Sequence, residues 1–142
     1  HELGCSVENI RELADEWHPV RNVGAAVASG SFRTMGMLIA PCSIRTLGEI
    51  TSGVTSSLLT RAADVVLKER RRLVLMVRET PLHLGHLRNM VSVTEMGAVV
   101  APPVPAFYAK PDSIDAMITQ SVARALDLFD ITLAETHRWT EM

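Results

Sequence analysis

The sequence predicts an α/β fold in which a parallel sheet is layered with helices. Three apolar runs have the length of buried strands, and amphipathic helical patterns separate them along the chain. The clearest case is a helical pattern over 54–70, which is followed by the run Leu73–Val77 and then by another helical pattern. Strands covered on both faces read as continuous apolar runs, as this one does. No repeat or low-complexity linker interrupts the pattern, so we expect one domain over 1–142.

Composition and charge restrict the class of protein. Apolar residues make up 47% of the 142 positions and charged residues 21%, which is ordinary for a globular domain with a real core. The formal net charge of −2 gives no reason to expect binding to nucleic acid or to an anionic membrane. Cys5 and Cys42 form no CxxC motif and no disulfide framework, so we expect a cytoplasmic protein. No apolar run approaches the roughly 20 residues that a membrane-spanning helix needs.

The first half of the chain contains one helix, one turn and one strand by pattern. Apolar residues recur at helical spacing over 6–14, with Ser6 as the expected N-cap. Ser29-Gly30-Ser31-Phe32 reads as a turn, whose backbone amides could also hold a phosphate. The run Met35–Ala40 is the first expected strand, and Ser43 is placed to cap a following helix. Free N–H groups at such a helix start can bind an anion or a cofactor, although a cap that only caps explains the same pattern.

The second half alternates helix and strand. The helix over 54–70 carries an apolar stripe, and the strand Leu73–Val77 follows it directly. Thr80 and Pro81 mark the start of the next helix, which Gly97 ends. A third strand is expected at 98–101, before a proline-rich loop. Because the carboxyl ends of parallel strands share one edge, we expect the polar residues after all three strands to lie together.

A last helix is expected from an N-cap at Asp112 to Phe129. Its apolar periodicity predicts a face turned to the core, and Arg124 lies off that face. The predicted core residues of this helix are Ile114, Met117, Ile118, Val122, Leu126 and Phe129.

The segment over 58–90 carries the main candidate binding residues. Arg61 and Lys68 are seven residues apart, so one helix face holds both about 10 Å from each other, where they could bind an anion. A solvated ion pair between Asp64 and Lys68 is the plainer alternative. Arg78 and Glu79 directly follow a strand, which is where open parallel sheets bind ligands.

Two further chemistries are possible by residue type and are weaker. Cys42 could act as a nucleophile, but no histidine is placed by sequence to activate it. His83 and His86 are three residues apart on a helix, a spacing that can hold a metal, but no third ligand is suggested nearby. We therefore expect no metal.

A set of motifs in chain order resembles one known family over about Ser29 to Trp139. The segments are Ser29-Gly30-Ser31-Phe32, Pro41-Cys42-Ser43, Leu59 to Arg71 (LTRAADVVLKERR), Val77 to His83 (VRETPLH), Gly97 to Val100, and Pro103 to Tyr108 (PVPAFY). Together they are similar to UbiX-type flavin prenyltransferases.

The resemblance implies a three-layer Rossmann-like domain of the flavodoxin type, with helices on both faces of the sheet. It implies binding of reduced FMN and of dimethylallyl phosphate, without a metal. The implied reaction joins the dimethylallyl group to N5 and C6 of the flavin, and the prenylated FMN passes to a UbiD-type decarboxylase. The implied assembly is a large homo-oligomer, commonly a dodecamer, with sites at subunit boundaries.

The resemblance also implies roles for single residues. The flavin contacts match Ser43, Ile44, Arg45, Thr46 and Arg78. The contacts to dimethylallyl phosphate match Arg61, Lys68, Tyr108 and Arg124, some of them from a neighbouring subunit. Glu79 matches an acidic residue that handles protons, so the catalytic set is Glu79, Lys68 and Arg61. Weaker matches to the pocket are Ser31, Trp139 and Glu2.

One departure and two alternatives accompany this resemblance. The family begins with a strand, a turn and a helix that hold the flavin phosphate, and the sequence from His1 onward contains no match to them. We therefore expect a sheet with open apolar surface. A related FMN-dependent cysteine decarboxylase would share the fold, but its Asn-containing turn is replaced here by 43–46. A non-catalytic FMN-binding or assembly subunit is the other alternative.

Overall fold

The chain forms a parallel sheet of three strands in the order β1-β2-β3. The structure is a computed structural model and describes residues 4–133. The strands are β1 (Gly36–Cys42), β2 (Arg72–Val77) and β3 (Val99–Val100). In the register of the first pair, Gly36 lies opposite Arg72 and Cys42 opposite Val77. The predicted parallel α/β fold is therefore confirmed, and each strand lies within two residues of its expected position.

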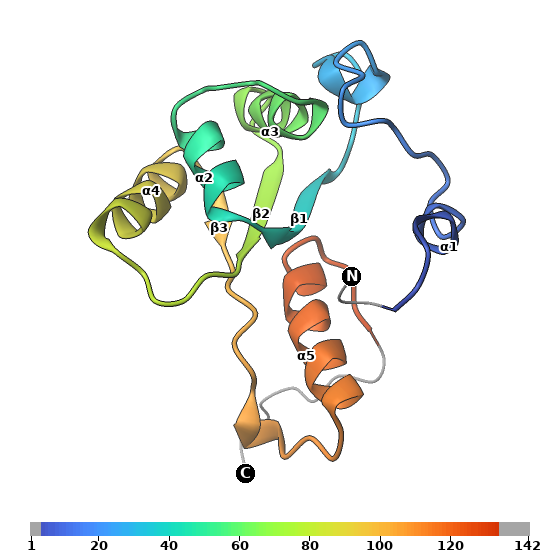
Figure 1. Ribbon diagram of the computed structural model, residues 1–142, viewed down its shortest axis with the longest axis vertical. Coiled ribbons are helices and arrows are strands. Elements are labelled where there is room, and N and C mark those ends of the chain that lie inside the picture. The colour runs from blue at the N-terminus through green and yellow to red at the C-terminus, as the bar shows by residue number, and fades with distance from the viewer. Residues whose placement is uncertain (1–3, 134–142) are drawn as a thin grey trace.

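Helices cover both faces of this sheet. In Figure 1, α2 (Ile44–Thr51), α3 (Leu58–Lys68) and α4 (Leu84–Glu95) lie together on one side, and α5 (Ile114–Asp127) lies apart from them beyond the strands. The short α1 (Val7–Arg11) stands away from the sheet in the same view. Two short 3₁₀ turns, η1 (Ala26–Ala28) and η2 (Phe107–Ala109), complete the elements. Within residues 4–133, no helix is both long enough and apolar enough to cross a membrane.

The alternation of β2 explains why both faces are covered. Leu73, Leu75 and Val77 belong to the main apolar core, together with residues of α2, α3 and α4. Val74 and Met76 point to the opposite face and are also buried. Burial of a side chain of this size contributes about 1.5–3 kcal/mol each. A strand that is apolar at every position from Leu73 to Val77 therefore requires cover on each side.

The predicted core face of the last helix is only partly confirmed, because Phe129 is buried but Ile114, Ile118 and Val122 are exposed. In α5, Ile114 is 71% exposed and Ile118 is 55% exposed, whereas Ala123 and Ala125 are buried. Small residues therefore face the rest of the chain, and the larger apolar residues Ile114 and Ile118 turn outward. Periodicity identifies the helix but does not say which of its faces the rest of the chain covers.

Three helix starts also differ from expectation. Ser113 caps α5 in place of Asp112, and its hydroxyl accepts a hydrogen bond from the Ala116 N–H. Ser57 caps α3, three residues after the expected start. His83 caps α4, so Thr80 and Pro81 belong to the loop before the helix. In each case a neighbouring side chain reaches the free N–H groups of the first turn better than the residue chosen from the sequence.

Helices α3 and α4 end in the same hydrogen-bonded turn. At the end of α3, the N–H of Arg71 donates to Val66 O and that of Arg70 donates to Leu67 O. At the end of α4, the N–H of Ala98 donates to Val93 O and that of Gly97 to Thr94 O. This is the Schellman arrangement, which needs a left-handed residue after the cap. Gly97 supplies it with φ +104, but at the end of α3 the position is held by Arg70 with φ +56.

This difference predicts opposite effects of two matched substitutions. Arg70→Gly is expected to raise the free energy of unfolding by about 1 kcal/mol, because the left-handed conformation strains a residue with a Cβ. Gly97→Ala is expected to lower it by about the same amount. Urea denaturation of both variants measures the two changes, and a loss of stability in Arg70→Gly would contradict the argument.

Candidate functional site

The ends of β1 and β2 bring two of the predicted clusters side by side. Cys42 lies opposite Val77, and the Arg78 N–H donates to Cys42 O at 3.2 Å. The turn 43–46 therefore begins next to Arg78 and Glu79 at one edge of the sheet, as predicted. Ser43 caps α2, with its hydroxyl accepting from the Thr46 N–H at 3.1 Å. The Glu79 carboxylate accepts from the Thr80 N–H at 3.0 Å, and both Arg78 and Glu79 are exposed.

Arg45 is held by a partner that the sequence reasoning missed. Its Nε donates to Glu49 Oε1 at 2.8 Å, one helical turn away. The other carboxylate oxygen of Glu49 accepts from the Ser56 hydroxyl at 2.8 Å. The Ser56 hydroxyl and then the Arg45 guanidinium hold the pKa of Glu49 below its ordinary value. The i,i+4 spacing of Arg45 and Glu49 was the signal in the sequence that could have found this pair.

Arg61 and Lys68 both lie on α3, as predicted, but the pairing of their neighbours differs. Asp64 accepts from Arg61 Nη1 at 2.9 Å, so it does not pair with Lys68. The ammonium of Lys68 pairs with Glu69. The alternative pairing of Asp64 with Lys68 is therefore wrong, because Asp64 pairs with Arg61 and Lys68 pairs with Glu69.

Lys68 lies near the N-terminal end of β2, whereas Arg78 lies at its C-terminal end. Only Glu69, Arg70 and Arg71 separate Lys68 from the start of β2, whereas Arg78 follows the last residue of that strand. Six strand residues at about 3.3 Å each place the two backbones about 20 Å apart. Figure 1 shows α3 leading into one end of β2 and the loop to α4 leaving the other. Side chains of one chain cannot close this distance.

Tyr108 and Arg124 occupy the region between the β3 loop and α5. Arg124 borders a cavity of about 140 Å³ with Met76 of β2 and the loop that follows β3. Its Nη1 donates to Asp127 Oδ2 at 2.7 Å. Tyr108 lies on η2 and is 56% exposed. The expectation that the third loop would carry Tyr108 to the shared edge is wrong, because in Figure 1 the chain after β3 runs on and places η2 far from α2.

The weaker candidates are only partly described. Ser31 lies in the exposed loop before β1, where its hydroxyl is 2.9 Å from that of Ser29. Glu2 and Trp139 lie outside residues 4–133, which the structure describes.

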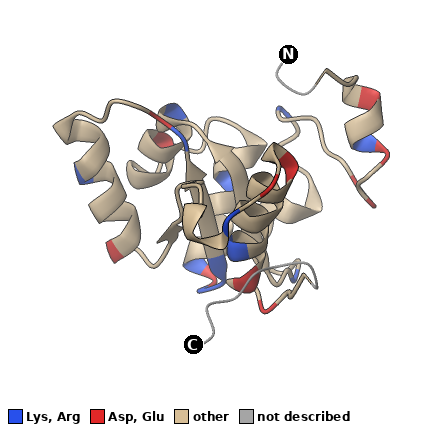
Figure 2. Cartoon of the chain, turned by 90° about the horizontal axis from the view of Figure 1, so that it is seen from below, with Lys and Arg blue, Asp and Glu red and all other residues tan. Residues whose placement is uncertain are grey.

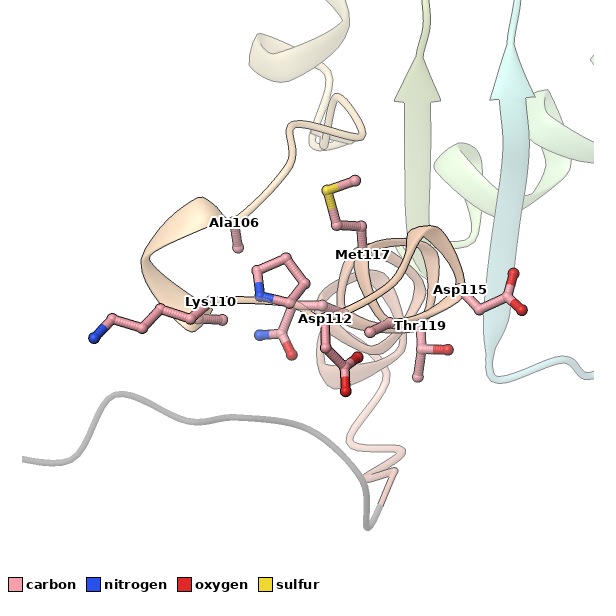
Figure 3. Close-up of a pocket in the computed structure, with 10 residues that line it drawn as sticks. Ala106, Lys110, Asp112, Asp115, Met117 and Thr119 are labelled. Atoms are coloured by element: carbon pink, nitrogen blue, oxygen red, sulfur yellow. The ribbon is translucent and has the colours of Figure 1, made fainter.

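A hollow next to η2 is bordered by acidic as well as basic residues, which does not favour a phosphate. It lies between η2 and α5, has a volume of about 470 Å³, and is bordered by Asp112 and Asp115 as well as Lys110 (Figure 3). In Figure 3 the Lys110 and Asp115 side chains point away from each other. Figure 2 shows basic residues spread over several elements, with acidic ones among them. Size alone therefore does not identify the site.

The two alternative chemistries find little support. Cys42 is fully buried, and burial raises the pKa of its thiol to about 11, so it carries no thiolate at neutral pH. His83 uses Nδ1 to accept from the N–H groups of Gly85 and His86, which leaves it as a helix cap. Among residues 4–133, no three His, Cys, Asp or Glu side chains come together as a metal site.

The edge formed by 43–46 and Arg78 suits a flavin nucleotide. It carries the Ser43 and Thr46 hydroxyls, which lie 3.0 Å apart, and the guanidinium groups of Arg45 and Arg78. Ser43 already accepts from the Thr46 N–H, so the first-turn donors that face a ligand are the N–H groups of Ile44 and Arg45. Such donors match the carbonyl and phosphate oxygens of FMN.

The hydrogen bonds that tether Glu49 to Arg45 and Ser56 are expected to stabilise the protein at neutral pH and to lose this effect in acid. A carboxylate whose pKa is lowered by folding stabilises the protein above the unfolded pKa and loses this effect as pH falls through the folded pKa. Above about pH 5 the melting temperature of Glu49→Gln should therefore be lower than that of wild type, and the two should converge as the pH falls below the ordinary pKa of a glutamate. A difference that stays constant across this range would contradict the tether.

Comparison with known proteins agrees with this arrangement. The model of the family described as "Flavoprotein" matches residues 6–133. The flavin prenyltransferase UbiX of Neisseria meningitidis serogroup B (strain ATCC BAA-335 / MC58) is 59% identical over 141 residues, which are 99% of this chain and 75% of that protein. The UbiX of Escherichia coli (strain K12) is 59% identical over 134 residues, or 94% of this chain and 71% of that protein.

Two solved structures are similar over nearly the whole chain. The crystal structure of AnUbiX (PadA1) in complex with FMN and dimethylallyl pyrophosphate has a TM-score of 0.98 and 53% identity, over 100% of this chain and 76% of that one. A dodecameric FMN-dependent UbiX-like decarboxylase from Escherichia coli O157:H7 has a TM-score of 0.96 and 44% identity, over 99% of this chain and 76% of that one. This chain belongs to the family of UbiX flavin prenyltransferases.

Proposed function

We propose that this protein transfers a dimethylallyl group from dimethylallyl phosphate to reduced FMN, forming bonds to N5 and C6 of the flavin. The observation that carries the proposal is the donor-rich edge formed by Ser43–Thr46 and Arg78, in a chain 59% identical to flavin prenyltransferases. The reduced flavin supplies the electron-rich acceptor when it is bound. The residues of the chain hold the two substrates and move the proton.

The phosphate end of the donor needs positive charge to leave. In this proposal Arg61, Lys68 and Arg124 neutralise the phosphate, and the Tyr108 hydroxyl donates a hydrogen bond to it. Charge-assisted donors of this kind stabilise the leaving group as the C–O bond breaks. Glu79 would act as the acid–base group of ring closure, which adds a proton to the double bond of the dimethylallyl group and removes the proton from C6, because its exposed carboxylate stands beside Arg78 at the flavin edge.

The proposed site needs residues from more than one subunit. The backbones of Lys68 and Arg78 are about 20 Å apart along β2, farther than their side chains can close. A second copy would bring its own Lys68 to the Arg78 edge of the first. The dodecameric state of the UbiX-like neighbour from Escherichia coli O157:H7 supports an assembly of this kind. We therefore propose a homo-oligomer, with a dodecamer as the expected form.

The product implies a partner enzyme. Prenylated FMN would be released to a UbiD-type decarboxylase, and the protein would act in the cytoplasm. Neither a nucleic acid nor a membrane is needed for this chemistry.

Replacement of Lys68 tests whether this side chain holds the phosphate of the donor. Lys68→Met is expected to abolish prenyl transfer, a loss of at least about 100-fold, while FMN stays bound, because the leaving phosphate loses a cation. Mass spectrometry after incubation with reduced FMN and dimethylallyl phosphate detects the five-carbon addition. Lys110→Met makes the same chemical change in another exposed lysine and should keep the wild-type rate. Turnover of Lys68→Met at the wild-type rate would overturn the assignment.

The same assay separates the competing functions. A cysteine decarboxylase would release CO₂ from a cysteine-derived substrate and leave the flavin mass unchanged, and a non-catalytic subunit would do neither. A parallel incubation with dimethylallyl pyrophosphate, the compound in the AnUbiX complex, distinguishes the monophosphate from the diphosphate as donor.

Mixed oligomers test whether two subunits share one site. Lys68→Met and Arg78→Ala should each be inactive alone, but co-assembled they should regain activity, at most about one quarter of wild type for random mixing at sites built from two chains. The recovery arises because some sites then draw an intact Lys68 and an intact Arg78 from different chains. Mixtures with no activity, although native mass spectrometry shows both subunits together, would place both residues in one chain.

A further inference from the structure

The end of α3 is fastened to a loop about 40 residues earlier in the chain. Nη1 of Arg71 donates to Phe32 O at 2.6 Å, and Nη2 donates to Gly30 O at 2.7 Å. One guanidinium thus donates to two carbonyls of the Ser29–Phe32 loop. The planar group suits this bidentate contact because the directions of its N–H donors are fixed. No local sequence pattern connects these residues.

The same loop lies against the charged end of Lys68. A Cβ placed on Gly30 would be 2.8 Å from Lys68 Nζ and closer still to the Glu69 carboxylate. Glu69 pairs with the Lys68 ammonium, and this pairing holds the pKa of Glu69 below its ordinary value, with a smaller contribution from Arg71. The bare backbone at Gly30 is therefore the surface on which the paired head groups rest.

The turn between Lys68 and Arg71 makes this arrangement rigid. The Schellman hydrogen bonds from Arg70 and Arg71 back to α3 fix Glu69 and Arg70, the two residues between Lys68 and Arg71. Lysine has a flexible side chain that loses much rotamer freedom when it is held in place. A fixed support for its ammonium reduces the entropy that substrate binding must still remove.

We propose that Arg71 is a positioning residue for prenyl transfer, which holds the Ser29–Phe32 loop so that Gly30 seats the paired head groups of Lys68 and Glu69. The inference rests on the proposed function, because it assigns Lys68 to the phosphate of the donor. Arg71 does not touch substrate in this proposal and acts through the loop. Its effect should therefore appear in the binding of the phosphate and not in the binding of FMN.

Two substitutions disturb the support in different ways. Arg71→Ala releases the loop, and Gly30→Ala leaves it fastened but pushes the two flexible head groups aside. Both are expected to raise the KM and the Kd for dimethylallyl phosphate about tenfold, as for loss of charge-assisted hydrogen bonds, with the Kd for FMN within about twofold of wild type. Arg71→Lys keeps the charge without the bidentate contact and should recover part of the loss. Arg33→Ala removes an exposed cation that directly follows the Ser29–Phe32 loop in sequence. This variant should keep the wild-type KM and Kd.

Calorimetric titration with dimethylallyl phosphate gives the Kd without turnover, and thermal melts report folding. Wild-type values of KM and Kd in both Arg71→Ala and Gly30→Ala would overturn the proposal. A loss in which FMN affinity falls as much as phosphate affinity would also overturn it, because Arg71 would then be structural only. If Arg71→Ala fails to fold, Gly30→Ala decides between the outcomes by itself. Failure of wild type to prenylate FMN would instead overturn the proposed function.

Discussion

The parallel pairing of β1 with β2 determines where chemistry can occur in this chain. Its register places Cys42 opposite Val77, so the turn that starts α2 and the residue that follows β2 become neighbours. The Arg78 N–H closes this edge by donating to Cys42 O. Two clusters that are more than 30 residues apart in sequence thereby form one surface rich in hydrogen-bond donors. Such a surface suits a nucleotide cofactor because its charges and N–H groups are fixed before the ligand arrives.

The same pairing separates Lys68 from that surface. Helix α3 returns the chain to the start of β2, so its last residue must lie at the far edge of the sheet from Arg78. A connection between two parallel strands must bring the chain back to the start of the second strand, so the last residue of α3 can lie at no other end. The proposed role of Lys68 therefore requires a neighbouring molecule, which is the physical reason for proposing a site shared between subunits.

The turn after α3 serves the fold and the proposed site at once. Its N–H groups bond the last carbonyls of the helix, with Arg70 in the left-handed conformation. It also brings both Lys68 and Arg71 to the Ser29–Phe32 loop. The cost of a non-glycine residue in this conformation is small compared with what the main core contributes. Stability and placement of charge are therefore coupled at one short segment.

The sequence by itself determined the layered α/β fold, because uninterrupted apolar runs such as that in β2 can only be buried on both faces. It also determined the family resemblance, and it identified Arg78 and the turn after β1 as neighbours. Only the tertiary structure decided that Ile114 and Ile118 face outward, that η2 carries Tyr108 away from the edge, and that Arg71 holds Gly30. Periodicity and spacing describe contacts within one element, whereas these features depend on which distant backbone lies opposite each side chain.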